Sequence, residues 1–263
     1  MSTKSLLCAV FLCVSLAAAV VRAQTTAPPP VGPVRNIVLV HGAFVDGSSW
    51  NGVIARLQKK GYHVSAVQNP LTSLADDVAA TRRVLAQQTG PTVLVGHSWG
   101  GVVITEAGAD DPNVVGLVYV AAIAPNVGES PMDILKRGPQ MPASTSMKRD
   151  DNGFLWLDPA TYRVNFAADV PENLTRVLIA AQQPIAGSAF DETVSKAAWQ
   201  SKPSWYIVTT KDRAVSPEIQ RSMASHIGAT IVEIPSSHLV TVSHAAATAD
   251  AIDKAAKEFG NQQ

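Results

Sequence analysis

A serine between two glycines is the residue best suited to chemistry in this sequence. It lies in the segment Gly96-His97-Ser98-Trp99-Gly100, which fits the G-x-S-x-G pattern of a nucleophile elbow. Such an elbow is a tight turn between a strand and a helix, and it lifts the serine above the edge of a sheet. Here the apolar run 92–95 precedes the serine, and a predicted helix over 101–109 follows it. We therefore expect Ser98 to act as a nucleophile.

A serine nucleophile needs a base to remove its proton, and the sequence offers six histidines. His238 follows the predicted strand 230–234, so we expect it at the edge of the sheet where Ser98 also lies. His244 fits better as the start of the last helix. His97 adjoins the serine, and His41 is expected to order the loop beneath it. His63 opens a strand at the opposite sheet edge, and His226 lies late on a helix. His238 is the predicted base.

The base in turn needs an acid that orients its imidazole. Asp212 follows the predicted strand 205–208, and it lies between the nucleophile and the base in the chain, as in other hydrolases with this elbow. Asp191 and Glu192 are poorer candidates because they fall within an irregular segment. Asp212 is the predicted acid, with the role of fixing the tautomer of His238 and stabilising its cation.

Two backbone N–H groups should bind the negative oxygen that develops when the serine attacks a carbonyl. The N–H after the nucleophile belongs to Trp99. The second is expected in the loop His41-Gly42-Ala43-Phe44 after the first strand, with Ala43 as the predicted donor. Asp46 in the same loop has no second carboxylate or histidine at ligand spacing, so we expect no metal site.

The elements around these residues alternate between strands and helices. Apolar runs of strand length occur at 36–40, 63–68, 92–95, 114–122, 205–208 and 230–234. Helical patterns occur at 49–60, 73–87, 101–109, 217–227 and about 244–259. This alternation predicts an α/β fold with a doubly wound, mostly parallel sheet.

The alternation stops between about residues 126 and 200, where no clear strand is visible and helical patches occur near 171–182 and 191–199. We expect this segment to be an inserted, mainly helical lid over the carboxyl ends of the strands, within a domain that spans 34–260. Its apolar and aromatic side chains predict an apolar acyl or aryl pocket: Met141, Met147, Phe154, Trp156, Phe190 and Trp199.

The N-terminus has the pattern of a secretory signal peptide. Lys4 precedes an apolar run, and Val21-Arg22-Ala23 places small residues at −3 and −1 of a cleavage site after Ala23. We expect a signal peptide (1–23), a Pro-rich linker (24–33) and a secreted or periplasmic protein that has no membrane span after cleavage. An uncleaved membrane anchor is the alternative.

Composition limits the partners and the chemistry of the chain. It has 263 residues, with 21 Lys and Arg against 21 Asp and Glu, and two cysteines. Cleavage after Ala23 would remove both cysteines and two basic residues, which leaves 240 residues with 19 basic and 21 acidic groups. Such a mature chain can form neither a disulfide nor a thiol nucleophile, and its charge gives no attraction for nucleic acid. The sequence leaves open whether the protein forms oligomers.

Taken together, these residues resemble those of the α/β-hydrolase fold superfamily. The shared features are His41-Gly42-Ala43, the elbow around Ser98, Asp212 and His238, and the similarity spans about residues 34–260. Within the superfamily the sequence is similar to a small branch of bacterial esterase-like hydrolases, related to plant methyl-ester esterases and hydroxynitrile lyases. This resemblance implies a site between lid and sheet, no cofactor, and the roles of nucleophile, acid, base and oxyanion donors for the residues named above.

The predicted function is hydrolysis of carboxylic esters by a serine hydrolase, through a Ser-His-Asp triad and an acyl-enzyme. The expected substrate is a small-molecule ester, apolar or aryl in character. A lyase that breaks a C–C or C–CN bond is the first alternative, but similar hydroxynitrile lyases carry threonine and lysine where this sequence has Gly42 and Leu239. A protein that has the triad but only binds a ligand is the second.

Overall fold

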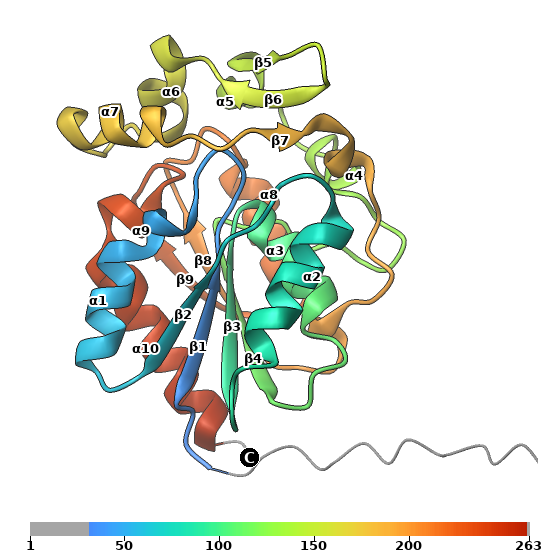
Figure 1. Ribbon diagram of the computed structural model, residues 1–263, viewed down its shortest axis with the longest axis vertical. Helices are drawn as coiled ribbons and strands as arrows, with labels where there is room; N and C mark the ends of the chain where they lie inside the picture. The colour runs from blue at the N-terminus through green and yellow to red at the C-terminus, as the bar shows by residue number, and fades with distance from the viewer. Residues whose placement is uncertain (1–31, 262–263) are drawn as a thin grey trace, which may run out of the picture.

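The computed structural model describes residues 32–261, and its centre is a six-stranded sheet (Figure 1). The strands are ordered β2-β1-β3-β4-β8-β9, and every neighbouring pair is parallel. Their bounds are β1 Asn36–Val40, β2 His63–Val67, β3 Thr92–His97, β4 Val114–Val120, β8 Ser204–Thr209 and β9 Thr230–Ile234. The predicted doubly wound parallel sheet is confirmed, and the carboxyl ends of its strands meet at one edge.

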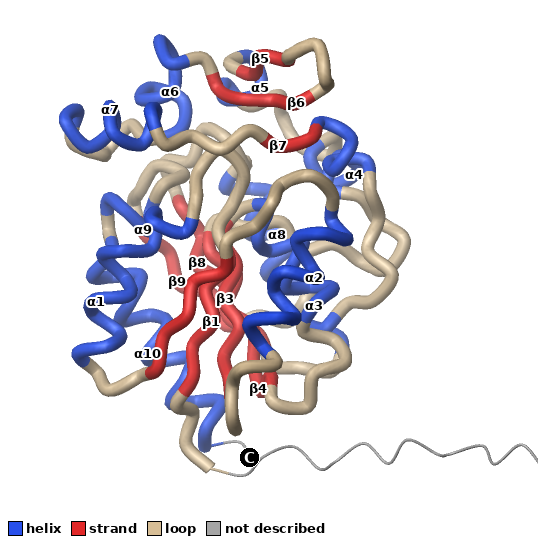
Figure 2. Tube along the Cα trace, in the orientation of Figure 1, coloured by secondary structure: helices blue, strands red, loops and turns tan. Residues whose placement is uncertain are grey.

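Helices cover both faces of this sheet (Figure 2). One face is covered by α1 (Asn51–Lys59) and α10 (Ala245–Asn261). The other face is covered by three helices: α2 (Leu74–Leu85), α3 (Trp99–Ala107) and α8 (Pro217–His226). Two short helical segments precede α1 and α10, namely the 3-10 helix η1 (Gly47–Trp50) and α9 (Val240–Ser243).

The strand β1 shows why a continuous apolar run suits the middle of this sheet. All five of its residues are buried. Ile37 and Leu39 belong to the core beneath α1 and α10, whereas Val38 and Val40 belong to the core beneath α2 and α3. Successive side chains of a strand point to opposite faces, so a strand that is buried on both faces carries apolar residues in succession, as at 37–40. Asn36 is the buried exception at the start of the strand, and its amide donates to the backbone carbonyls of Thr89 and Pro91.

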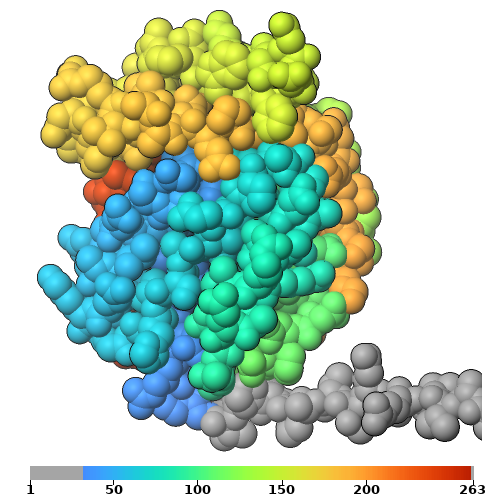
Figure 3. Space-filling model, in the orientation of Figure 1, coloured from blue at the N-terminus to red at the C-terminus, as the bar shows by residue number. Residues whose placement is uncertain are grey.

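Most of residues 126–200 form a cap over the carboxyl edge of the sheet, and the last of them run down its side beside α3 (Figure 3). The cap is mainly helical, as predicted. Its helical segments are α4 Pro131–Leu135, α5 Pro142–Thr145, α6 Pro159–Phe166, α7 Glu172–Ala180, and the 3-10 helices η2 Gly187–Asp191 and η3 Ala198–Gln200. The α7 helix accounts for the helical patch predicted at 171–182.

The cap also holds a small antiparallel sheet, so the expectation of no strand in this segment is wrong. It consists of β5 (Met147–Arg149), β6 (Phe154–Leu157) and β7 (Ile185–Ala186), with β6 in the middle. Strands of two to four residues are too short to show a periodic pattern in sequence.

The helical patch predicted at 191–199 is also wrong, because most of this segment is a loop between η2 and η3. The backbone N–H groups of this loop bond to a side chain of the main domain, whereas in a helix they would bond to backbone carbonyls. The carboxylate of Glu106 in α3 accepts hydrogen bonds from the backbone N–H groups of Ser195, at 2.6 Å, and Lys196, at 3.2 Å. These bonds fasten the end of the cap to the helix that follows the elbow.

The predicted signal peptide, residues 1–23, lies outside the described residues, as does the linker 24–33 except for its last two residues. Within residues 32–261, none of the helices is long and apolar enough to cross a membrane. The described residues include the whole of the predicted domain, 34–260.

Candidate active site

Ser98 lies at the turn between β3 and α3, where the chain passes from the sheet into a helix within one residue. Its backbone has a φ of 53°, in the left-handed region that residues with a side chain rarely adopt. Close backbone contacts require the flanking glycines. A Cβ on Gly96 would lie 2.4 Å from the carbonyl oxygen of Gly100, and one on Gly100 would lie 2.4 Å from that of Val40. The geometry is that of a nucleophile elbow, with Ser98 at the wall of a cavity.

His238 lies in the loop after β9, and Asp212 lies in the loop after the neighbouring strand β8. Because the two strands are parallel, these loops meet at the carboxyl edge of the sheet. His238 Nδ1 is 2.7 Å from Asp212 Oδ2, and both side chains are buried. The carboxylate can therefore hold the proton of the imidazole on Nδ1, which leaves Nε2 free to accept one.

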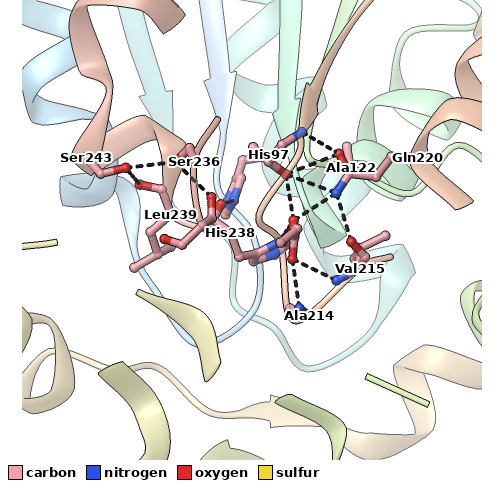
Figure 4. A network of polar contacts seen from close by, with 12 residues as sticks. His97, Ala122, Ala214, Val215, Gln220, Ser236, His238, Leu239 and Ser243 are labelled. Atoms are coloured by element: carbon pink, nitrogen blue, oxygen red, sulfur yellow. Dashed lines mark hydrogen bonds and ion pairs between the residues drawn. The ribbon is translucent and has the colours of Figure 1, made fainter. Parts of the chain in front are cut away.

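Five donors surround the carboxylate of Asp212 (Figure 4). The backbone N–H groups of Ala214 and Val215 donate to Oδ1, at 2.7 and 3.0 Å. The hydroxyl of Thr209 and the amide of Gln220 donate to Oδ2, at 2.7 and 2.9 Å, beside the imidazole. Burial by itself raises the pKa of this carboxyl, but the imidazole and the hydrogen bonds outweigh burial and hold the pKa below its ordinary value. This carboxylate is therefore an anion at neutral pH.

Ser98 and His238 line the same cavity. Within the described residues no hydrogen bond joins the Ser98 hydroxyl to the imidazole, whereas the bond between His238 and Asp212 is formed. In sites without a substrate, catalytic hydrogen bonds are often long, and they tighten when the substrate binds. The structure thus brings the predicted nucleophile, base and acid to one edge of the sheet.

The two predicted oxyanion donors also lie at this edge. Ala43 follows β1 and lines the cavity with Ser98, and Trp99 is the first residue of α3. In the described part of the chain, neither backbone N–H donates to a protein acceptor. The positive end of the helix dipole adds to the attraction for a negative oxygen here. The indole of Trp99 is fixed separately, because its N–H donates to the buried carboxylate of Asp77 at 2.6 Å.

His97 supports the predicted base, a role that the sequence analysis did not foresee. Its Nε2 lies 3.0 Å from the backbone carbonyl oxygen of His238, and the two ring centroids are 4.9 Å apart. A carbonyl oxygen can only accept, so His97 donates through Nε2. Burial, with a further effect of the nearby His238, lowers the pKa of His97 to about 3. A neutral ring therefore holds the backbone of the base, through a contact between residues 141 positions apart that no motif indicates.

The remaining histidines lie where the sequence analysis expected them. His41 is buried under the loop after β1, and its Nε2 accepts a hydrogen bond from the backbone N–H of Asn69 at 2.9 Å. His63 begins the edge strand β2 and is exposed. His226 ends α8, and His244 lies immediately before α10.

A cavity of about 460 Å³ lies between the cap and the elbow. Its volume suits a small organic molecule. Much of its wall is apolar, and the cap supplies most of the apolar side chains: Met132, Leu135, Met141, Met147, Leu155 and Phe190. Lys136, Arg149 and Asp191 are the charged residues of the wall. The predicted site between lid and sheet is therefore a mainly apolar space beside Ser98.

Half of the lid residues that were predicted to line this pocket do so, namely Met141, Met147 and Phe190. The prediction is wrong for Phe154 and Trp156, because these side chains lie on the opposite face of β6 from Leu155 and Leu157, which do line the cavity. It is also wrong for Trp199, whose indole N–H donates to a backbone carbonyl at the start of the cap. The alternation of side chains along a strand, missed with the strand itself, explains the first error.

Within residues 32–261, no group of three or more His, Cys, Asp or Glu side chains is placed so that it could hold a metal ion. The acidic side chain nearest the candidate base is Asp212, whose oxygens are all engaged by the donors described above.

The chain is similar in sequence and in fold to known hydrolases and esterases. The alpha/beta hydrolase nvfD of Aspergillus novofumigatus is 30% identical over 214 residues, which cover 72% of this chain and 82% of the relative. Methylesterase 1 of Arabidopsis thaliana is 25% identical over 236 residues, 75% of this chain and 86% of the relative. The crystal structure of a pyrethroid hydrolase from Sphingobium faniae superposes with a TM-score of 0.73 at 24% identity, over 85% of this chain and 97% of that one, and shows a shared fold.

The family model described as the alpha/beta hydrolase family matches residues 37–251. This match begins in β1 and ends in α10, so it includes the elbow, the loop of Asp212 and the loop of His238. It covers most of the chain. The chain therefore belongs to the alpha/beta hydrolase family.

Proposed function

We propose that the protein is a serine hydrolase that cleaves small-molecule carboxylic esters through an acyl-enzyme on Ser98. The Ser98 Oγ attacks the ester carbonyl carbon while His238 Nε2 takes the hydroxyl proton, and Asp212 stabilises the resulting imidazolium. The backbone N–H groups of Ala43 and Trp99 bind the negative oxygen of the tetrahedral intermediate.

The second half of the reaction uses the same groups. Collapse of the intermediate breaks the bond to the alcohol oxygen, and His238 gives its proton to that oxygen. Water then attacks the acyl carbon and passes a proton to His238. This proton returns to Ser98 Oγ when the carboxylic acid leaves, so the enzyme ends in the state in which it began.

The 2.7 Å contact between His238 and Asp212, at the cavity that also holds Ser98, carries this proposal. A carboxylic ester as the substrate is supported by the methylesterase among the relatives. The chain is accordingly a carboxylic ester hydrolase. The mainly apolar wall supports an ester with an apolar or aryl acid or alcohol part.

The lyase alternative has no support from the cavity. Similar hydroxynitrile lyases carry a lysine at the position of Leu239, but this leucine is fully buried in the core that packs against α2 and α3. It is not one of the residues that line the cavity beside Ser98. The chain thus supplies no cation at this position to hold a leaving cyanide.

The decisive experiment is labelling with a fluorophosphonate together with hydrolysis of p-nitrophenyl esters of increasing acyl length. We expect the protein to be labelled at Ser98 and to hydrolyse the esters, and we expect Ser98→Ala to lose both activities. Ser144→Ala is the matched control, because Ser144 also lines the cavity but donates its hydroxyl to a backbone carbonyl, at 2.7 Å. Labelling without ester turnover would favour a lyase, and absence of labelling would contradict both enzymes.

We also propose that residues 1–23 direct export and are removed after Ala23. The charged start, the apolar run and the small residues at the cleavage site support this proposal. Expression of the full chain in a bacterium that has a periplasm, followed by mass spectrometry of the N-terminus, tests it. We expect a product that begins at Gln24 in the periplasm or the medium. A product that begins at Met1 in the membrane fraction would indicate an uncleaved anchor instead.

A further inference from the structure

Gln220 of α8 is fully buried beside the proposed catalytic acid, although glutamine is mostly an exposed residue in proteins. Its Nε2 lies 2.9 Å from Asp212 Oδ2 and 2.9 Å from the carbonyl oxygen of Val215. Its Oε1 accepts a hydrogen bond from the backbone N–H of Thr209 at 2.9 Å. One side chain thus joins the end of β8, the acid, and the end of the loop that carries the acid (Figure 4).

The partners of this amide fix its orientation. The Thr209 N–H can bond only to an oxygen, and the Val215 carbonyl can bond only to an N–H, so Oε1 must face the first and Nε2 the second. One hydrogen of Nε2 then serves Val215, and the other points to Asp212 Oδ2, with the Thr209 hydroxyl oxygen nearby at 3.0 Å. An ionised glutamate would offer no donor here, and leucine would offer neither donor nor acceptor.

We propose that Gln220 is a positioning residue for ester hydrolysis, which holds Asp212 Oδ2 against His238 Nδ1 and reduces the negative charge on that oxygen. It acts through Asp212, since it is buried behind the acid and does not line the cavity beside Ser98. This inference rests on the proposed serine hydrolase function.

The electrostatic part of the proposal follows from the position of Oδ2. This oxygen contacts both the imidazole and the Gln220 amide. Without the amide donor, more negative charge remains on Oδ2, and the protonated imidazole is stabilised more strongly. Activity on the acid side of the pH profile would then be lost at a higher pH. His97 and Tyr206 are further titratable groups that interact with Asp212, and both are buried.

Gln220→Leu tests the loss of the donor. We expect kcat to fall about tenfold, as for loss of one hydrogen bond to a charged group. We expect KM to stay within about twofold, because binding energy from the cavity is unchanged. The acid limb of kcat/KM should move to higher pH by at least about half a unit. These constants are measured with a p-nitrophenyl ester, per active site counted with the fluorophosphonate.

Gln220→Glu, which has nearly the same shape, gives a second and independent result. While the new carboxyl keeps its proton, it can donate to Asp212 as the amide does, so kcat should stay near the wild-type value at low pH. When it ionises, two carboxylates face each other and repel, and kcat should fall. The variant should therefore show a loss of kcat at high pH that the wild-type enzyme lacks.

Asn36→Leu is the matched control for lost buried hydrogen bonds. Asn36 is buried at the start of β1, at the opposite end of the strands, and its amide donates to the carbonyl oxygens of Thr89 and Pro91 at 2.8 and 3.4 Å. This variant should lower thermal stability and leave the pH profile unchanged. If Gln220→Leu keeps the kcat and the acid limb of the control, Gln220 has only a structural role and the inference is wrong.

Two further outcomes are also decisive. If Gln220→Leu does not fold, Gln220→Glu alone decides, because a pH profile identical to that of the wild type would overturn the inference. If the wild-type protein is neither labelled nor active, the serine hydrolase proposal itself fails. That failure differs from an active wild-type enzyme with unaffected Gln220 variants, which would overturn only the role of Gln220.

Discussion

At Gly42, the loop after β1 passes so close to the elbow that a side chain has no room. A Cβ on this residue would lie 2.8 Å from the Cβ of Ser98 and 3.0 Å from the carbonyl oxygen of His97. Gly42→Ala should therefore displace either the nucleophile or the adjacent Ala43 N–H that is proposed to bind the oxyanion. We expect kcat for a p-nitrophenyl ester to fall by about 10²-fold, the effect of losing one oxyanion donor.

The control for this substitution is another Gly→Ala change at a tightly packed position, but in the core and away from the candidate active site. Gly116 in β4 serves, because a Cβ there would lie 2.2 Å from the ring of Phe259 in α10. Gly116→Ala should lower the free energy of unfolding by about 1–3 kcal/mol, as overpacking does, and leave kcat per active site unchanged. Equal losses of kcat in the two variants would show that the space at Gly42 has no specific role.

At the scale of an element, β6 divides its side chains between the cavity and the outer part of the cap. Leu155 and Leu157 line the cavity, whereas Trp156 lies on the opposite face. Leu155→Ala removes bulk from the wall, so we expect the preferred acyl group to become longer. The ratio of kcat/KM between p-nitrophenyl decanoate and acetate measures this change. Trp156→Ala should keep the wild-type ratio, and an equal shift in both variants would contradict this assignment of the two faces.

The main strands and helices could be predicted because each carries its own signal in the sequence. The predicted strands 36–40 and 230–234 match β1 and β9 residue for residue. The helix predicted at 217–227 matches α8 to within one residue, and Ser216 caps it by accepting a hydrogen bond from the Glu218 N–H. β7 has no such signal, since its two residues form a strand only by pairing with β6. Elements that depend on a distant partner are those that the sequence alone does not predict.

The same distinction applies to the candidate site. Ser98, Asp212 and His238 were found because each follows a predicted strand, and parallel strands bring their carboxyl ends together. Gln220 and His97 were missed as supporting residues because their partners are set by how α8 and the loops pack, not by spacing. Motifs therefore indicate the candidate reacting groups, and the packed structure identifies the side chains that contact them.

For the whole molecule, the buried histidines make stability depend on pH. Burial lowers the pKa of His97 to about 3 from an ordinary 6.5, and burial also lowers that of His41. Below pH 6.5 the unfolded chain binds more protons at these residues than the folded protein does, so acid favours unfolding. Protonation of Asp77 has the opposite effect on folding stability between about pH 6 and 3.8, because burial raises the pKa of this carboxyl to about 6. The contribution of Asp77 can offset that of only one of the two histidines. The free energy of unfolding should therefore fall as the pH decreases below 6.5.

Replacement of His97 by leucine should remove part of this dependence. A titrating group of this kind contributes about 1.4 kcal/mol per pH unit, so between pH 8 and pH 5 the wild-type protein should lose about 2 kcal/mol more of its unfolding free energy than His97→Leu does. Urea unfolding at these two pH values measures the difference. His63→Leu, at the exposed edge strand β2, should keep the wild-type dependence. A parallel change in all three proteins would mean that His97 takes up a proton in the folded state, and a positively charged ring would then lie against the backbone of His238.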